Sequence, residues 1–274
     1  MKVLGVLLSI IVFCSIQSCD VYNSIASNCG FTLAIWNIGR FSNGVQSSST
    51  IDITKDLDII KKYDSFINKT LNPDVLVINE YNNVFYKDEN GKEFHTDSLF
   101  FNSFNYRFIG PEWWKCNAIF SKYKIRNLGH DDEMICYFTS HKAIKDDIKV
   151  SKRKTYFLEN IVEIRGRCLK IVTVHIDFSK KASGVYQRAQ ISELIDKYKD
   201  ETHVIICGDF NVGNYSQFKK SGYSVANDGS FKTYPSKGYA LDNIIYKGVD
   251  VSNIQMFSTT LSDHNPLSCK VTFK

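Results

Sequence analysis

The chain has 274 residues, of which 34 are basic and 29 acidic, and its formal charge is +5. This mild charge permits a polyanionic partner without requiring one, because domains that bind nucleic acid tightly are usually more basic. The eight cysteines form no Cys-x-x-Cys pair, which excludes the usual spacing of a structural zinc site and leaves open disulfides of undetermined pairing.

The first residues are typical of an export signal. Lys2 is followed by the apolar run Val3–Phe13 and then by small residues. The run is too short to span a bilayer comfortably and matches the core of a signal peptide. We therefore predict a signal peptide over residues 1–19.

Two kinds of processing fit this signal. Residues 16–19 resemble a bacterial lipoprotein processing site, with Cys19 as the lipidated residue. The alternative is ordinary cleavage near Ser18 or Ala26. We accordingly expect an exported protein that is secreted, periplasmic or lipid-anchored to the outer surface of a bacterial membrane.

The first elements after the signal are a strand, a helix and a second strand. Phe31–Ile38 is apolar and rich in β-forming residues, and Ile51–Leu71 has apolar residues at helical spacing. Asn72–Pro73 ends that helix. Asp74–Asn79 is a continuous apolar run, as expected of a strand buried on both faces.

The rest of the chain is mainly strand-like. We expect strands over Asn117–Ser121, Met134–Thr139, Tyr156–Ile164, Leu169–Ile176, Val204–Cys207, Asp242–Tyr246 and Leu267–Phe273. Val185–Tyr198 has the pattern of an amphipathic helix. No repeat or Pro/Gly-rich linker divides the chain, so we predict one α+β domain with sheets inside and helices outside.

The most informative motif is Gly208–Val212 (GDFNV), which follows the buried strand Val204–Cys207. Gly208 lets the backbone turn tightly, and Asp209 and Asn211 stand two residues apart, so both can point the same way. A carboxylate beside a carboxamide can orient a water and donate a hydrogen bond to a phosphoryl oxygen. The alternative is a polar turn, in which these residue types are common.

A second acid stands beside a histidine in Ser262–Pro266 (SDHNP). Asp263 is a candidate metal ligand or water-orienting group, and His264 is a candidate proton acceptor or charge stabiliser. Adjacent side chains of an extended segment point apart, so the pair needs a turn, which Pro266 favours. The alternative is an ordinary surface loop.

Four more polar side chains stand at the ends of predicted strands. Glu80 ends a doubly buried strand, where a carboxylate needs a partner such as Mg²⁺. Asn37 offers an amide oxygen to the same cation, or simply caps a turn. His175 is a phosphate contact or a structural histidine, and Asp242 is placed to hold His264 in one tautomer.

In this order and spacing, the motifs Trp36–Arg40 (WNIGR), Ile78–Tyr81 (INEY), Val174–Phe178 (VHIDF), GDFNV and SDHNP resemble those of the endonuclease/exonuclease/phosphatase superfamily. That superfamily includes deoxyribonuclease I, abasic-site endonucleases, neutral sphingomyelinases and inositol polyphosphate phosphatases. The resemblance implies one domain over residues 30–274. It also implies a deoxyribonuclease I-like α+β fold, a four-layer α/β/β/α sandwich of two mainly antiparallel sheets with outer helices.

The resemblance also implies roles for individual residues. The implied catalytic residues are His175, Asp209, Asn211, Asp242 and His264. The implied metal ligands are Asn37, Glu80 and Asp263, and the implied substrate contacts are Arg40 and Asn117. The expected metal is Mg²⁺, with Mn²⁺ or Ca²⁺ as alternatives. Asn79 stands where the family commonly has glutamine, and we expect little effect from this change.

The expected activity is hydrolysis of phosphodiesters, most simply of nucleic acid, by a metal-activated in-line attack of water. A phosphodiester repels nucleophiles through its own negative charge, and a divalent cation neutralises that charge. The segment after GDFNV, with Asn214 and Tyr215, has a nuclease-like pattern, for which the alternative explanation is generic similarity to the family. We expect a monomer without an obligate protein partner.

Two other functions stay open. A sphingomyelinase-like or other lipid or inositol phosphoesterase would need a membrane-contacting edge, which Trp113–Trp114 could supply. The same two residues could instead stack on bases or pack in the core. A surface-anchored binding protein without turnover is the third function, and the intact set of polar residues argues against it.

Overall fold

The computed structural model describes residues 30–41, 57–83, 85–87, 90, 93–96, 101–111, 115–126, 134–139, 155–178 and 184–274. The predicted signal peptide, Cys19 and the pair Trp113–Trp114 lie outside these residues. Within the described part of the chain, no helix is both long and apolar enough to cross a membrane.

The first sheet has six strands and combines the beginning of the domain with its last two strands. Its order is β14 (Val249–Met256), β15 (Leu267–Phe273), β1 (Phe31–Asn37), β2 (Val75–Tyr81), β6 (Cys116–Ser121) and β5 (Tyr106–Ile109). Only β1 and β2 run parallel, and the other neighbours are antiparallel.

The second sheet has seven strands and is built from one continuous part of the sequence. Its order is β12 (Ser224–Val225), β13 (Asp242–Lys247), β11 (Val204–Asp209), β10 (Arg167–His175), β9 (Tyr156–Ile164) and β7 (Lys124–Arg126), and β8 (Ile135–Tyr137) also pairs with β9. Here too one central pair, β10 and β11, is parallel.

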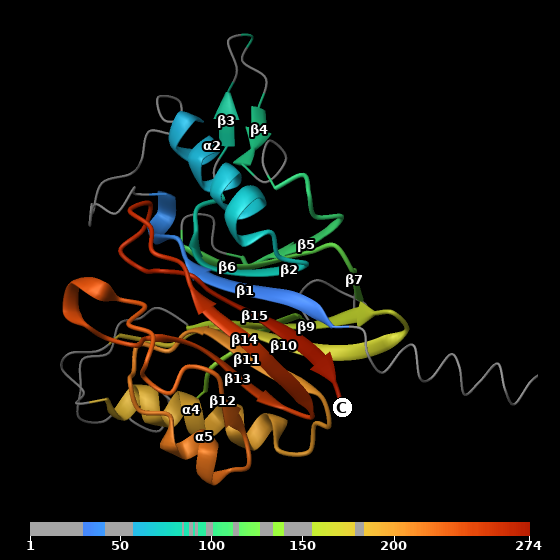
Figure 1. The fold of residues 1–274 in the computed structure, drawn as a ribbon, viewed down its shortest axis with the longest axis vertical. Coiled ribbons are helices and arrows are strands. Elements are labelled where there is room, and N and C mark those ends of the chain that lie inside the picture. The colour runs from blue at the N-terminus through green and yellow to red at the C-terminus, as the bar shows by residue number, and fades with distance from the viewer. Residues whose placement is uncertain are drawn as a thin grey trace, which may run out of the picture.

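Alternating side chains hold the layers together. In β1, Leu33 and Ile35 enter the core between the sheets, whereas Ala34 and Trp36 pack with helix α2 (Leu57–Phe66). This is the period of two that a strand imposes. Figure 1 shows α2 outside the first sheet, with both sheets between it and the opposite helices.

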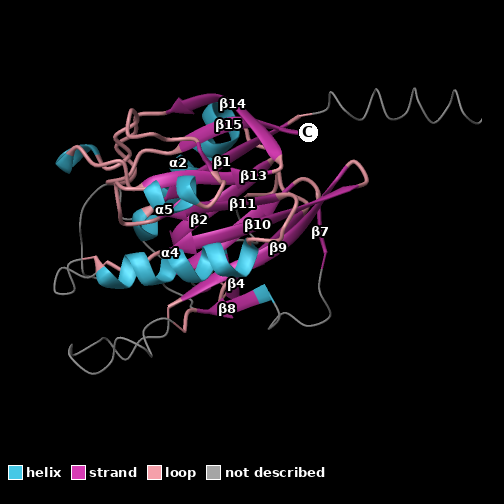
Figure 2. Ribbon diagram, turned by 90° about the horizontal axis from the view of Figure 1, so that it is seen from below, coloured by secondary structure: helices cyan, strands magenta, loops and turns pink. Residues whose placement is uncertain are grey.

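The second sheet repeats this arrangement. Ile205 of β11 faces the inter-sheet core, and Ile206 packs with the helices on the outer face, α4 (Val185–Tyr198) and α5 (Ser216–Lys220). Figure 2 shows α4 lying across this sheet. The predicted four-layer α/β/β/α sandwich with mainly antiparallel sheets is therefore confirmed.

Some elements differ from the sequence-based expectation. The helix expected over Ile51–Leu71 is described as α2 followed by a wider π-helical turn over Ile67–Leu71, and residues 51–56 lie outside the described part. That turn ends at Asn72, whose left-handed backbone lets its N–H bond the carbonyl of Ile67.

Several short elements were not predicted. They are the strands β3 (Phe85–Lys87), β4 (Glu93–His95), β5, β7, β12 and β14, and the 3₁₀ turns Gly39–Phe41 and Pro235–Lys237. Most of these strands are too short to show a clear apolar alternation, and β14 is half exposed.

Candidate active site

The parallel strand pairs bring the predicted polar residues to one end of the sandwich. Asn37 lies opposite Asn79 in the register of β1 and β2, and His175 lies opposite Asp209 in that of β10 and β11. Parallel strands run toward the same end of their sheet. Asn37 and Asn79 therefore lie side by side at the end of the first sheet, and His175 and Asp209 at the end of the second.

Glu80 reaches across to the second sheet because β2 is irregular at this point. The pairing of β2 with β6 shifts register between Ile78 and Tyr81, and Glu80 has a left-handed backbone with φ of 53°. A bulge of this kind re-aims a side chain. As a result, Oε1 of Glu80 lies 3.9 Å from Nε2 of His175.

Asp209 is the most tightly held acid of the site. It is 2% exposed, its Oδ2 accepts a 2.9 Å hydrogen bond from Nδ2 of Asn37, and its Oδ1 accepts one from the N–H of Asn211. Nε2 of His175 lies 3.7 Å from the same Oδ2. Asp209 thus joins the two sheets at the site.

Gly208 makes this position of Asp209 attainable. Its φ is 133°, and a Cβ there would stand 2.2 Å from the carbonyl oxygen of Val174 on β10. Only glycine fits both the backbone angle and the close approach. The expected tight turn before Asp209 is wrong, because Gly208 lies within β11, paired with Val174 and Asn243, and glycine is needed there for the close approach of β10.

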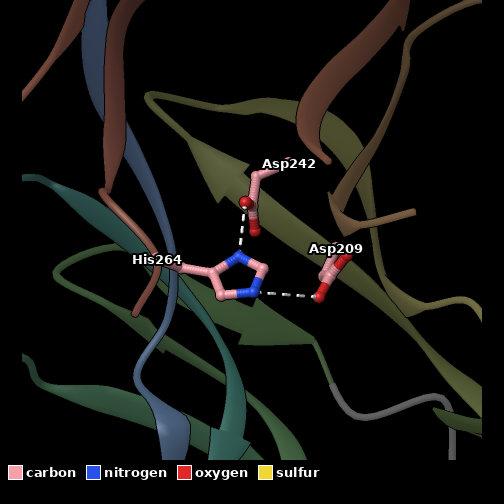
Figure 3. Close-up of side chains that lie close together, drawn as sticks. All are labelled: Asp209, Asp242 and His264. Carbon is pink, nitrogen blue, oxygen red and sulfur yellow. Dashed lines mark hydrogen bonds and ion pairs between the residues drawn. The ribbon is translucent and has the colours of Figure 1, made fainter. Parts of the chain in front are cut away.

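His264 comes to the site from the loop between β14 and β15. Its Nδ1 lies 2.7 Å from Oδ2 of Asp242, and its Nε2 lies 3.9 Å from Oδ2 of Asp209 (Figure 3). The side chain is held between two carboxylates, with the ring of Tyr234 packed 4.9 Å away, centroid to centroid.

The turn expected in the SDHNP segment is present. The hydroxyl of Ser262 donates to the carbonyl of Asn37 and accepts a hydrogen bond from the N–H of His264. The indole of Trp36 donates to the carbonyl of His264. These contacts fix the loop against the end of β1, which places His264 beside Asp209.

The two imidazoles of the site differ in charge. Burial lowers the pKa of His175 and outweighs the opposing charges of Asp209 and Glu80, which favours a neutral ring. Burial would also lower the pKa of His264, but the carboxylates of Asp242 and Asp209 outweigh it and raise that pKa to about 10. His264 is therefore an imidazolium at neutral pH.

The two acids that face His175 also differ. Burial and the charge of Asp242 raise the pKa of Asp209, against the opposing effects of the two imidazoles. Burial also acts to raise the pKa of Glu80, but His175, Lys115 and Arg40 together lower it. Glu80 is therefore held ionised by basic neighbours.

The donor atoms suit a hard divalent cation. Ligand atoms of Asp209, Asp242 and His264 lie within 4.8 Å of one another, although His264, as an imidazolium, has no lone pair for a metal ion. Oδ1 of Asp242 is buried with no hydrogen-bond partner among the described residues. Among the described residues, Oδ1 of Asn37 accepts a hydrogen bond from the N–H of Gly39, and an amide oxygen has a second lone pair. Carboxylate and amide oxygens are the ligands that Mg²⁺ prefers.

The remaining predicted residues lie around this centre. Nδ2 of Asn211 donates to the carbonyl of Ile176, and Asp263 is close enough for its charge to raise the pKa of His264. Nε of Arg40 lies 3.7 Å from Oε2 of Glu80. Asn117 is buried and accepts a hydrogen bond from Asn79.

Sequence reasoning missed two residues that shape the site. Asn79 was treated as a minor departure, but its side chain bonds Asn117, the carbonyl of Val174 and the N–H of Asp209, which lie in both sheets. Lys115 was not singled out, and its Nζ lies 2.9 Å from Oε1 of Glu80. No sequence pattern distinguished Lys115 from the other lysines.

Comparison with known proteins gives both distant relatives and similar folds. The UPF0294 protein VV2535 of Vibrio vulnificus (strain YJ016) is 28% identical over 116 residues, which are 39% of this chain and 40% of that protein. The chain thus spans about two-fifths of that relative's length.

Two solved structures are similar over most of the chain. An endonuclease/exonuclease/phosphatase from Beutenbergia cavernae matches with a TM-score of 0.61 and 14% identity, over 89% of this chain and 72% of that one. D. rerio TDP2, complexed with single strand DNA product, matches with a TM-score of 0.61 and 14% identity, over 89% of this chain and 100% of that one. At this identity the likeness shows the fold alone.

The family itself is shown by the sequence. The sequence model of the Endonuclease/Exonuclease/phosphatase family matches residues 34–264, a range that runs from β1 to His264. Members of this family are hydrolases that act on phosphoester bonds. The chain therefore belongs to the endonuclease/exonuclease/phosphatase family.

Proposed function

We propose that this protein is an exported, divalent-metal-dependent phosphodiesterase that acts on nucleic acid. The observation that carries the proposal is that Glu80, His175, Asp209 and His264 meet at one site. Glu80 lies 3.9 Å from His175, and Asp209 lies 3.7 Å from His175 and 3.9 Å from His264, measured between side-chain oxygen and nitrogen atoms. The predicted domain over residues 30–274 contains all of them.

The proposed reaction requires a bound divalent metal ion. Asn37, Glu80 and Asp263 are the proposed ligands, and Mg²⁺ is the proposed ion, with Mn²⁺ or Ca²⁺ as alternatives. When bound, the ion would neutralise the charge of the phosphodiester and stabilise the leaving oxygen.

The other residues have roles that follow from their positions. Asp209, fixed by Asn37 and Asn211, would orient the attacking water. The imidazolium of His264, held by Asp242, would stabilise the charge that develops on the phosphoryl group. The neutral His175 can donate a hydrogen bond to the same group.

Substrate binding completes the proposed reaction. Asn211 is proposed to contact the scissile phosphate together with His175, and Arg40 is the proposed substrate contact beyond it. Asn117, the other expected substrate contact, is buried and bonded to Asn79 and Tyr156, so it would act through Asn79 and not touch the substrate itself. The complex of D. rerio TDP2 with single strand DNA product supports nucleic acid as the substrate class, since that protein shares this fold. The mild positive charge of the chain is compatible with such a polyanion.

The test is a side-by-side assay of duplex DNA, RNA, sphingomyelin and inositol phosphates with Mg²⁺, Mn²⁺ or Ca²⁺, and with EDTA. We expect hydrolysis of a nucleic acid that EDTA abolishes and added metal restores. Hydrolysis of phosphocholine lipids alone would favour the sphingomyelinase-like alternative. Full activity in EDTA would refute the metal requirement, and no hydrolysis of any phosphoester would favour a binding protein.

Export is a separate part of the proposal and has its own test. Residues 1–19 would direct export, and lipidation of Cys19 would anchor the protein to the membrane. Fractionation of cells expressing the wild type and Cys19→Ser distinguishes the two processing routes. If the wild type is found in the membrane fraction and Cys19→Ser is released, the lipid anchor is supported. If both proteins are released equally, free secretion is supported.

A further inference from the structure

Lys115 lies at the site but has no role in the reaction proposed above. It stands directly before β6, and its Nζ lies 2.9 Å from Oε1 of Glu80. The Lys115 side chain is 30% exposed and that of Glu80 is 16% exposed. The closest ion pair of the proposed metal ligand Glu80 is therefore with a lysine of the same chain.

Both oxygens of Glu80 face basic groups. Oε1 faces Lys115 and, at 3.9 Å, Nε2 of His175, while Oε2 lies 3.7 Å from Nε of Arg40. Lys115 and Arg40 together bring two positive charges to one carboxylate. A divalent cation that binds Oε1 of Glu80 competes with the Lys115 ammonium for that oxygen and stands near two like charges.

A phosphodiester changes this balance because it brings negative charge to both cations. The lysine side chain has a flexible four-carbon stem and an ammonium that is a compact point charge, so it can move to a new oxygen acceptor. Its partial exposure leaves room for that movement. An acceptor offered by the substrate would free Glu80 for the metal.

We propose that Lys115 couples metal binding to phosphoryl binding. In the free protein it holds Glu80, and in the complex it contacts a phosphoryl oxygen, so that metal and phosphodiester each strengthen the binding of the other. Such coupling is reciprocal between the two ligands. Lys115 is thus a positioning residue for Glu80, and this inference rests on the proposed metal-dependent function.

The test measures Mn²⁺ binding directly by electron paramagnetic resonance, with and without inorganic phosphate as the probe, after correction for Mn²⁺ bound by phosphate in solution. In the wild type we expect phosphate to raise the Mn²⁺ affinity about fivefold or more, the lower range of typical couplings. In Lys115→Gln we expect tighter Mn²⁺ binding without phosphate and little further gain with it. Lys115→Arg keeps the charge and should retain most of the coupling.

Lys122→Gln is the matched control. Lys122 is also a half-exposed lysine in an ion pair, with Asp74 at 3.3 Å, but it lies at the far end of β6. It should behave as the wild type, and circular dichroism checks the folding of every variant.

The outcomes separate the two proposals. If Mn²⁺ binds the wild type but Lys115→Gln shows unchanged affinity and unchanged coupling, the role of Lys115 is refuted and the proposed function stands. Weaker Mn²⁺ binding in Lys115→Gln without phosphate also refutes it. If no variant binds Mn²⁺, the metal-dependent function itself fails, and the role of Lys115 fails with it.

Discussion

At the scale of single residues, Asp209 is the point on which the site converges. Its carboxylate lies between a neutral imidazole, His175, and a protonated one, His264, and it accepts a hydrogen bond from the amide of Asn37. Such a buried acid is costly unless its neighbours donate to it. Hydrogen bonds from Asn37 and from the N–H of Asn211, together with the positive charge of His264 at 3.9 Å, meet that need here.

We predict that Asp209→Asn lowers the rate of phosphodiester hydrolysis at least about a hundredfold, the scale of losing a main acid–base group. The amide keeps the shape of the side chain but loses the charge that orients water. Steady-state kinetics on the preferred substrate measure the loss, and Asp200→Asn on the exposed surface is the control. A near-normal rate would remove Asp209 from the catalytic set.

A double-mutant cycle tests whether Asp242 acts through His264. We expect His264→Ala to lower the rate at least about a hundredfold and Asp242→Asn to lower it about tenfold or more, because Asp242 fixes and charges the ring. The double variant should be no slower than His264→Ala alone. Fully additive losses would show that Asp242 contributes independently of His264.

The sequence predicted the acids and imidazoles of the site but not the residues that connect them. Glu80, Asp209 and His264 each follow a recognisable strand or motif, which is why they could be named. Asn79 and Lys115 act through side-chain contacts across the two sheets, and those depend on the register and the bulge of β2. Neither feature has a local pattern in the sequence.

At the scale of elements, the parallel pair β10–β11 depends on one glycine. We predict that Gly208→Ala destabilises the protein by at least about 2 kcal/mol, because the methyl group would collide with the carbonyl of Val174 in a backbone conformation that disfavours side chains. Urea unfolding measures the change. Gly213→Ala is the control, since nothing lies within 4 Å of its Cβ position, and equal losses in both variants would contradict the prediction.

An ion cluster around the buried Glu159 joins β9, β10 and α4 on the outer face of the second sheet. Glu159 accepts a 2.7 Å hydrogen bond from the hydroxyl of Tyr198 and pairs with Lys170 at 2.9 Å and Lys197 at 3.3 Å. Burial acts to raise the pKa of Glu159, but these partners lower it overall.

This shift predicts how stability depends on pH. A carboxyl whose folded-state pKa is lowered contributes stability above its unfolded pKa, which is 4.5 for glutamate, and that stability is lost as pH falls through the folded pKa. We expect Glu159→Gln to cost about 1.5–3 kcal/mol at pH 7, the scale of hydrogen bonds to a charged group. The cost should shrink below pH 4 in urea titrations, and a difference that does not change with pH would refute the assignment.

Long, regular elements were predictable and short ones were not. β1, β2, β11 and α4 carry continuous or periodic apolar patterns and were confirmed close to their expected bounds. β7 has three residues and β12 has two, which are too few for a period to be visible. The position of these strands is set by pairing with β9 and β13, which are remote in sequence from their own residues.

At the scale of the whole molecule, charge governs how a nucleic acid would bind. If nucleic acid is the substrate, we predict that the affinity for a single-stranded oligonucleotide falls as salt rises, with a logarithmic slope of about −0.7 for each phosphate neutralised. Fluorescence anisotropy in EDTA at several salt concentrations measures the slope. A flat response would argue against a polyanionic substrate, and a variant with Lys122→Gln at the far end should keep the wild-type slope.

The family, the fold class and the layer order were all predicted from sequence and are confirmed. The apolar periods indicated an α+β domain with sheets inside and helices outside, and the resemblance of the site motifs to the family implied the four-layer order. The identity of the substrate is a different matter. It depends on the surface around the site, which differs among proteins that share one fold, and the pair Trp113–Trp114 lies outside the described residues.

The order of strands in the first sheet has a consequence for biosynthesis. β1 lies between β2 and β15, so one of its two edges receives its partner only after more than two hundred further residues have left the ribosome. Until then the nascent chain carries an apolar ribbon with unpaired amides, which invites association with neighbouring chains. If the protein is exported as proposed, a delay of this kind would keep the chain unfolded until it has crossed the membrane. A circular permutant that begins at β14 should fold earlier during its synthesis.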